Sequence, residues 1–174
     1  MIFLIVIFLS NLYGVEVTQC FFEDRKYDIY FNDCFKIKNI YYSKSVNLPY
    51  ENYENKKYEN IFISSKKAYI EFEEAIKKCG SLNKKSDLKP SYRVMDFKLL
   101  KSKSRIANVV INFDEDINVV FGLVKTKNNF YLVYPPKNFE FINKEYRKEV
   151  TDFIIKWWIG FTEKVYLKSK LQMK

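Results

Sequence analysis

The stretch that decides the fold begins with Tyr92-Arg-Val-Met-Asp-Phe-Lys-Leu-Leu100 and Arg105-Ile-Ala-Asn-Val-Val-Ile-Asn-Phe113. Both runs are rich in β-branched and aromatic residues, which predicts strands. Two further strands are expected at Ile117-Asn-Val-Val-Phe-Gly-Leu-Val124 and Asn129-Phe-Tyr-Leu-Val-Tyr134. Residues 92–159 therefore predict an antiparallel sheet.

A helix is expected to follow this sheet. Pro135-Pro136 ends the fourth strand, and a short run at residues 139–142 leads into an amphipathic helix at Asn143. The spacing of its large apolar residues predicts one buried stripe made of Tyr146, Val150, Phe153, Ile154, Trp157 and Phe161. Trp158 lies off this stripe and is expected to be half exposed. Residues 160–174 form a basic tail that either prolongs the helix or frays.

The first half of the chain predicts the same order of elements in residues 15–79. Strands are expected at residues 15–22, 27–31, 34–42, 45–48 and 58–63, with residues 50–57 as a polar turn. Asn32-Asp33 predicts a hairpin. Ser64 or Ser65 is the expected N-cap of a helix that runs to Cys79, where Gly80 stops it. Residues 80–91 are the expected linker.

The order of elements repeats with a period of roughly 80 residues, which predicts internal duplication. Three pairs of segments anchor the repeat: Val46-Asn-Leu-Pro49 with Leu132-Val-Tyr-Pro135, Ile63-Ser64 with Ile142-Asn143, and Asn32-Asp33 with Asp114-Glu-Asp116. The predicted fold is thus α+β, with two tandem units packed as an intramolecular pseudo-dimer. Because two units in one chain can pair as subunits do, a monomer is expected.

The charge of the chain is unevenly distributed. The formal net charge is +9, and residues 1–79 are neutral, so residues 80–174 carry all of the excess. A basic half beside a neutral half suggests a polyanionic partner, either nucleic acid or an anionic membrane. The alternative is that the lysines only keep the surface soluble.

Several chemistries are disfavoured by composition. The chain has no histidine, which removes imidazole metal ligands and histidine-dependent nucleophilic catalysis. It shows no glycine-rich phosphate loop, so we expect neither an enzyme nor a cofactor or metal. The three cysteines, Cys20, Cys34 and Cys79, are odd in number and have no metal-ligand spacing. Reduced, buried thiols are expected, which favours the cytoplasm.

The apolar residues 1–14 leave three interpretations open. They are too few to span a bilayer as a helix, which needs roughly 20 residues. They can be a signal or anchor, although there is no basic start and no Ala-x-Ala-like exit: Gly14 is permissible at a cleavage position, but Leu12 two residues earlier is a poor fit. They can also be an additional core strand, or an artefact of an upstream start if translation begins at Val15.

The second unit resembles the SpoVG family, the stage V sporulation proteins G or septation regulators. The resemblance rests on Val94-Met-Asp-Phe-Lys-Leu99, Ala107-Asn-Val-Val-Ile-Asn-Phe-Asp114, Val119-Val-Phe-Gly-Leu-Val124, Phe130-Tyr-Leu-Val-Tyr-Pro-Pro-Lys137 and Ile142-Asn-Lys-Glu-Tyr-Arg-Lys-Glu-Val150. The first unit is similar through Val15-Glu-Val-Thr18, Val46-Asn-Leu-Pro49, Tyr58-Glu-Asn-Ile61 and Ile63-Ser-Ser65. Together these segments lie within residues 15–158.

The resemblance implies an α+β fold, pairing of two units, and binding of DNA and RNA in the regulation of septation or sporulation. In the second unit only Lys137 matches the family's basic stretch, and Arg147 matches the arginine at the start of its helix. In the first unit the position that matches the basic stretch is Tyr50-Glu51-Asn52, which is not basic.

Nucleic-acid binding requires clustered cations for the phosphates. The candidate residues are Lys125, Lys127, Lys137, Lys144, Arg147 and Lys148. Tyr131 or Tyr134 can stack on unpaired bases. The alternative function is an exported or membrane-tethered, non-enzymatic interaction protein built on the same repeat.

Overall fold

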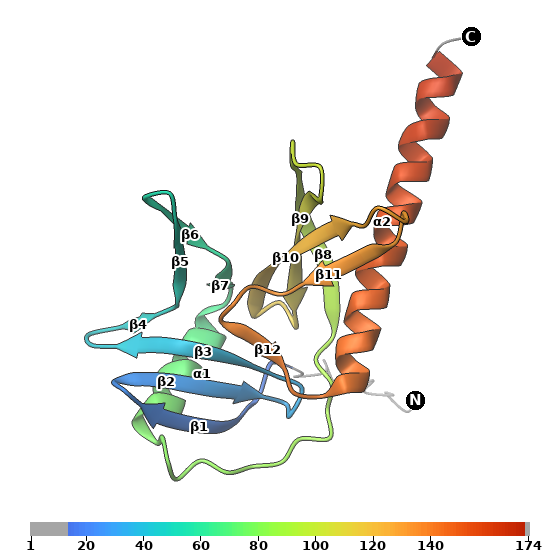
Figure 1. The fold of residues 1–174 in the computed structure, drawn as a ribbon. Coiled ribbons are helices and arrows are strands. Elements are labelled where there is room, and N and C mark those ends of the chain that lie inside the picture. The colour runs from blue at the N-terminus through green and yellow to red at the C-terminus, as the bar shows by residue number, and fades with distance from the viewer. Residues whose placement is uncertain (1–13, 173–174) are drawn as a thin grey trace, which may run out of the picture.

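The computed structural model describes residues 14–172, with side chains described as far as Val165. The first half holds β1 (Val17–Glu23), β2 (Lys26–Phe31), β3 (Phe35–Tyr42), β4 (Val46–Asn47), β5 (Tyr50–Tyr53), β6 (Lys56–Glu59), β7 (Ile61–Ile63) and α1 (Lys66–Lys77). The second holds β8 (Tyr92–Leu99), β9 (Arg105–Phe113), β10 (Ile117–Lys125), β11 (Tyr131–Tyr134), β12 (Phe139–Phe141) and α2 (Lys144–Gln172). The fold is α+β, as predicted (Figure 1).

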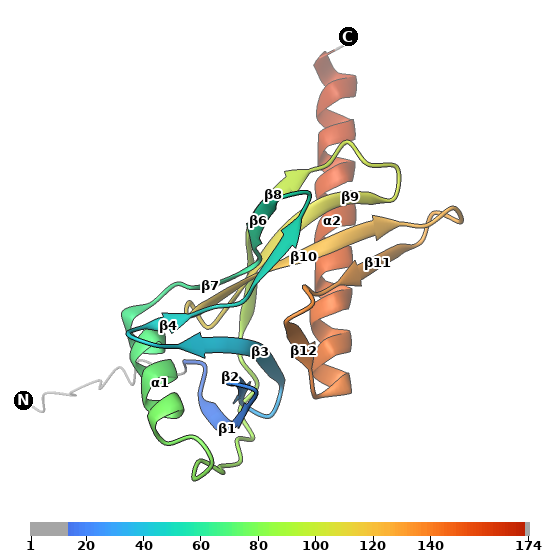
Figure 2. The same ribbon diagram turned by 60° about the vertical axis from the view of Figure 1, so that its left-hand side comes forward.

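The two halves exchange strands. The first sheet has the order β1-β2-β3-β12, with β4 also on β3, and the second has the order β11-β10-β9-β8, with β7 also on β10. β12 therefore belongs to the second half but pairs with β3, through Phe139 with Ile37 and Phe141 with Phe35. β7 makes the reverse exchange onto β10 (Figure 2). Neither sheet is thus built from one half alone.

The pattern of pairing is the same in both halves. The backbone N–H of Asn32 donates to Glu16, and that of Asp114 donates to Ser91. The exchanged strands are also joined in the same way. The backbone N–H of Lys38 in β3 donates to Asn138 O just before β12, and that of Val120 in β10 donates to Asn60 O just before β7. This correspondence supports duplication, which stays a prediction.

The contacts of the two halves change one of the residue matches on which the predicted repeat was based, the match at the start of the helices. Ser65 accepts a hydrogen bond from Ala68 N at 2.9 Å, and Asn143 accepts one from Tyr146 N at 3.0 Å. These two N-caps are equivalent, so Ile63 corresponds to Phe141 rather than to Ile142. The N-cap side chain fixes the register because it must satisfy a free N–H of the first helical turn.

One aromatic core joins the halves. Phe35 of the first sheet lies 5.0 Å from Phe113 of the second and 4.9 Å from Phe139, measured between ring centroids. Phe139 also lies 5.6 Å from Phe121. All four rings are buried. Since the exchanged strand β12 carries the central ring, the exchange and the shared core depend on each other.

The buried stripe of α2 differs from the predicted one. Tyr146, Val150, Ile154 and Trp158 are buried at successive intervals of four residues. The prediction that Trp158 is half exposed is therefore wrong. Trp157 is only partly buried and packs its ring 5.4 Å from Phe97 of β8. Trp157 and Trp158 follow Ile154 by three and four residues, so both fit the helical spacing of a buried stripe. Which of them is buried depends on where the sheet packs against α2.

Four tight hairpins, β1–β2, β2–β3, β5–β6 and β9–β10, each turn on two consecutive residues with positive φ. Asn32 and Asp33 have φ of 49° and 50°, which confirms the predicted hairpin. Residues 50–57 are not a simple turn, however, because β5 and β6 form a separate two-stranded sheet there. Glu54 and Asn55 form its tight connection, with φ of 48° and 62°.

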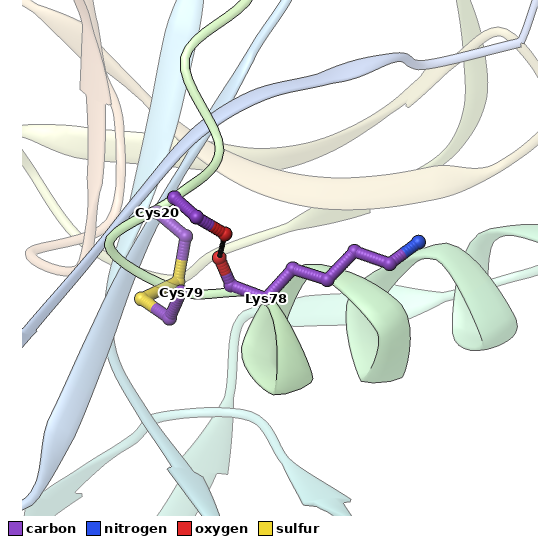
Figure 3. The surroundings of a disulfide bond; sticks show 4 residues. Cys20, Lys78 and Cys79 are labelled. Atoms are coloured by element: carbon purple, nitrogen blue, oxygen red, sulfur yellow. Dashed lines mark hydrogen bonds between the residues drawn. A yellow bond between two sulfur atoms is a disulfide. The ribbon is translucent and has the colours of Figure 1, made fainter.

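The prediction of reduced thiols is wrong for two of the three cysteines. Cys20 of β1 and Cys79, just after α1, form a disulfide (Figure 3). Cys34 is a free, buried thiol. The bonded pair lies 59 residues apart in the sequence. Only the packing of α1 against β1 brings these positions together, so sequence spacing could not reveal the bond.

The predicted linker lies along the edge of β1. Lys84 N donates to Thr18 O at 2.9 Å, and Ser86 N donates to Asp33 Oδ2 at 3.2 Å. Between residues 14 and 172, no helix has the length and apolar character needed to cross a membrane. The interpretations of residues 1–13 concern a segment outside the described residues.

Candidate nucleic-acid interface

Two hollows flank the β5–β6 hairpin where the two halves meet. They have volumes of ≈ 550 and ≈ 440 Å³ and share Glu51 and Asn52 of β5. Because side chains alternate along a strand, Tyr50 at one hollow and Tyr53 and Tyr58 at the other lie on opposite faces of the hairpin. We call the two hollows together the hairpin groove and define it by Lys26, Tyr41, Tyr50, Glu51, Asn52, Tyr53, Tyr58, Arg105, Asn108 and Lys137. Figure 1 shows the hairpin rising beside β9 and β10.

The hairpin itself distinguishes the two halves. It occupies the chain between Pro49 and Asn60, whereas the corresponding connection in the second half has only Pro136 and Lys137 between Pro135 and Asn138. The hairpin thus supplies a wall of both hollows. The second sheet faces it across the smaller one, and Lys26 and Tyr41 of the first half together with Lys137 face it across the larger one. This arrangement explains why neither half contains the groove alone.

Tyrosines line the groove. Tyr41, Tyr50, Tyr53 and Tyr58 are all exposed, and Tyr53 is the most open at 65%. Lys26 lies 5.7 Å from the centroid of the Tyr41 ring. Lys57 lies 4.6 Å from that of Tyr50, and its hydrogen bond to Glu59 raises the pKa of Lys57. Exposed rings of this kind can stack on planar ligand groups.

Arg105 is fixed on the face of the second sheet. Its Nε donates to Asn108 Oδ1 at 2.9 Å. The guanidinium lies across Gly122 of β10 so closely that an added Cβ there would be 2.8 Å from Nε. Among the described residues no carboxylate lies within 4.0 Å of Arg105, Lys26 or Lys137. The remaining N–H groups of Arg105 are thus available to an anion.

Lys137 ties the β11–β12 connection to the hairpin. Its backbone N–H donates to Glu51 Oε1 at 3.1 Å, which leaves its exposed side chain at the groove. Lys137 is the one residue of the predicted set that lines the groove.

The other predicted cations lie in two separate places. Lys125 and Lys127 are exposed at the β10–β11 hairpin, and Lys144, Arg147 and Lys148 are exposed in the first turns of α2. Both ribbon views show the β10–β11 hairpin well away from the start of α2 (Figures 1 and 2). Lys148 pairs with Asp152 at 2.6 Å, and this hydrogen bond raises the pKa of Lys148. The six predicted residues therefore do not form one surface.

The two predicted stacking residues differ in their surroundings. Tyr134 is exposed and lies opposite Gly122 in the β10–β11 pair. Because cross-strand partners share a face, Tyr134 is on the same side of the sheet as Asn108, which also pairs with Gly122. Tyr131 is partly buried against the core. Tyr134 is therefore the better placed of the two.

Sequence reasoning missed most of the groove. The available signal was Glu54-Asn55 between short runs that each carry tyrosine, which fits a two-residue hairpin. For Lys26 and Arg105 no such signal exists, because each is an ordinary cation near a strand end until the halves pack together.

A third hollow lies between α1 and β1 and is lined by Glu16, Glu71 and Glu74 and by Lys78 and Lys84. Burial raises the pKa of Glu71. Lys78 is paired with Glu74 and Lys84 with Glu16, so these two lysines are less available to a polyanion. Among the described residues, no group of three or more Cys, Asp or Glu side chains is arranged to hold a metal ion.

Comparison with protein-family models, with curated proteins and with solved structures found no match. The resemblance to the SpoVG family stays a prediction.

Proposed function

We propose that this chain is a non-enzymatic protein that binds single-stranded nucleic acid, DNA or RNA, in the hairpin groove. One observation carries the proposal. The two hollows of the groove each combine two exposed tyrosines with cations that have no carboxylate partner within 4.0 Å among the described residues: Tyr41 and Tyr50 with Lys26 and Lys137 in one, and Tyr53 and Tyr58 with Arg105 in the other. Of the side chains that the structure describes, Glu51 is the one carboxylate that lines them. Cations that bind phosphates together with rings that stack on bases are the two requirements for holding a single strand.

The fixed position of Arg105 supports this assignment. A guanidinium already held by Asn108 and Gly122 loses less conformational freedom when it binds a phosphate. A role in septation or sporulation is the corresponding biological proposal, and it rests only on the resemblance to SpoVG.

The test is fluorescence anisotropy with a labelled 12-nucleotide single strand and a duplex of the same sequence. If three groove cations each contact one phosphate, log K should fall with log salt with a slope of about −2. Raising the salt from 50 to 200 mM should then weaken binding by roughly 20-fold. The duplex should bind more weakly, because its bases cannot stack on the tyrosines.

Two matched variants locate the site. One changes Lys26, Arg105 and Lys137 to Glu, and the other changes Lys144, Arg147 and Lys148 to Glu, so both alter the net charge equally. We expect the first to abolish binding and the second to retain most of it. The reverse result would place the site at α2, and no binding of any strand at 50 mM salt would refute the proposed function.

Individual tyrosines provide a finer test. Tyr53→Ala or Tyr58→Ala should each weaken binding by at least about 5-fold, the lower end for a lost base stack. Phe22→Ala, an exposed ring outside the groove, is the control and should change little.

The disulfide favours a second candidate, an exported interaction protein. Structural disulfides form and persist mainly in oxidising compartments. In this case the tyrosine-rich groove would bind a protein partner. Cell fractionation combined with thiol trapping decides between them: an oxidised Cys20–Cys79 pair in an extracytoplasmic fraction supports export, and a reduced pair in the cytoplasm excludes it.

A further inference from the structure

Asp116 is a buried carboxylate with two neutral hydrogen-bond donors. It lies between β9 and β10, and only 4% of it is exposed. Its Oδ1 accepts a hydrogen bond from Ser65 Oγ, and its Oδ2 accepts one from Val15 N at 3.0 Å. Asp116 forms no ion pair within 4.0 Å among the described residues, although the Lys67 ammonium lies nearby, beside Gly14. A buried carboxylate with no directly bonded cation is costly.

The donor at Val15 is buried too. Val15 is 2% exposed, and its N–H faces Asp116 across the junction of the two halves. Gly14 lies against the same place, where an added Cβ would be 2.7 Å from Asp116 Oδ2 and 2.3 Å from Lys67 Nζ. Lys67 itself is paired with Glu71. The Val15 nitrogen is therefore the atom at which a positive charge would directly meet Asp116.

We propose that the chain is cut between Gly14 and Val15, and that the new α-ammonium group of Val15 pairs with the carboxylate of Asp116. A peptidase and water are the reactants. The peptide C–N bond breaks, and water supplies the hydroxyl that completes the carboxyl group of Gly14 and a proton to the nitrogen of Val15. A second proton from solvent gives the ammonium ion that is normal for an α-amino group at neutral pH.

The ion pair between the Val15 ammonium and Asp116 would be stronger than an ion pair on the surface. The nitrogen already lies at hydrogen-bonding distance from Oδ2, so the pair forms without movement of the backbone. Exclusion of water strengthens the attraction, and Ser65 satisfies the other carboxylate oxygen. Ser65 is also the N-cap of α1, so the pair links the N-terminus of the first half, its helix and a turn of the second half.

Two independent features agree with this proposal. Gly14 is the kind of small residue that export peptidases accept directly before the cut, and residues 1–13 are strongly apolar, although they lack a basic start and Leu12 is larger than usual at its position. The Cys20–Cys79 disulfide is of the kind that forms after export. The proposal does not depend on what the hairpin groove binds.

Intact mass tests the cleavage. The full-length chain, tagged at its C-terminus, is expressed in bacteria and recovered from each cell fraction. We expect the mass of a chain that begins with Val15. A mass that includes any residue before Val15, or one that has methionine at position 15, would overturn the proposed cut.

A double-mutant cycle tests the ion pair. Four chains begin at Val15 or at Leu12, each with Asp116 or with Asp116→Asn, and are released from a fusion partner with the disulfide intact. We expect Asp116→Asn to lower the ratio of folded to unfolded protein about tenfold more in the chain that begins at Val15 than in the chain that begins at Leu12. A factor of about ten corresponds to one pKa unit of interaction between the ammonium and the carboxylate. Equal losses in both chains would overturn the pairing.

A second comparison needs no substitution at Asp116. Acetylation of the N-terminus of the Val15 chain removes the charge but keeps an N–H donor. The acetylated chain should unfold at a lower urea concentration than the free one. Identical midpoints would refute the ion pair even if Asp116→Asn fails to fold.

Discussion

Phe139→Ala tests whether the two halves share one core. Phe139 is 3% exposed and belongs to the exchanged strand β12. Its ring contacts Phe35 in the first sheet and Phe113 and Phe121 in the second. Alanine at this position removes the ring where both sheets meet and leaves the backbone pairing of β12 unchanged.

The expected cost is about 4 kcal/mol in the free energy of unfolding, within the range for buried Phe→Ala changes. The cost should not be at the low end of that range, because strands on both sides of Phe139 keep the neighbouring side chains from filling the cavity that alanine would leave. For a chain of this length each kcal/mol lowers the melting temperature by about 2–4 °C. The melting temperature should therefore fall by roughly 8–16 °C.

Urea unfolding followed by circular dichroism and by tryptophan fluorescence is the assay. Both probes should report a single transition at the same midpoint, because the exchanged strands make the halves one cooperative unit. The control is Phe130→Ala in the β10–β11 hairpin, which is 68% exposed and should change stability by at most about 0.5 kcal/mol.

Two results would refute the reasoning. A loss below about 1 kcal/mol would mean that Phe139 does not fill a shared core. Two separate transitions, of which only one moves with Phe139→Ala, would mean that the halves fold independently and that the strand exchange is not a stable feature of the protein.

Two further predictions concern the cysteines. Replacing both Cys20 and Cys79 with Ser should lower the free energy of unfolding by about 4 kcal/mol, because the bond closes a loop of 59 residues; an unchanged urea midpoint would show that the bond does not form. Burial raises the pKa of Cys34 from its ordinary value near 9 to about 11. The folded protein should therefore resist iodoacetamide at pH 8 while the unfolded protein reacts rapidly. As the pH rises from about 9 to about 11, the thiol of Cys34 ionises in the unfolded protein but not in the folded one. The free energy of unfolding should therefore fall over this range. The fall should be absent in Cys34→Ala.

The local elements were largely determined by the sequence. β9 has the predicted bounds. α1 is capped by Ser65, one of the two predicted N-caps, and ends at Lys77, two residues before the predicted end and shortly before the predicted Gly80. These features depend on side-chain alternation, on capping and on the positive φ of 87° at Gly80, all of which act over a few residues. The α+β class follows from them.

The site was not determined in this way. Lys137 was predicted as a binding residue, yet the hollow that it lines depends on a hairpin from the other half, and the second hollow depends on Arg105 lying over Gly122. The disulfide and the choice of Trp158 over Trp157 likewise depend on which surfaces meet. A sequence pattern encodes which face of an element is apolar but not which partner covers it. In this chain each sheet takes a strand from the opposite half, so the long-range pairing of β7 with β10 and of β12 with β3 decided the core and the groove together.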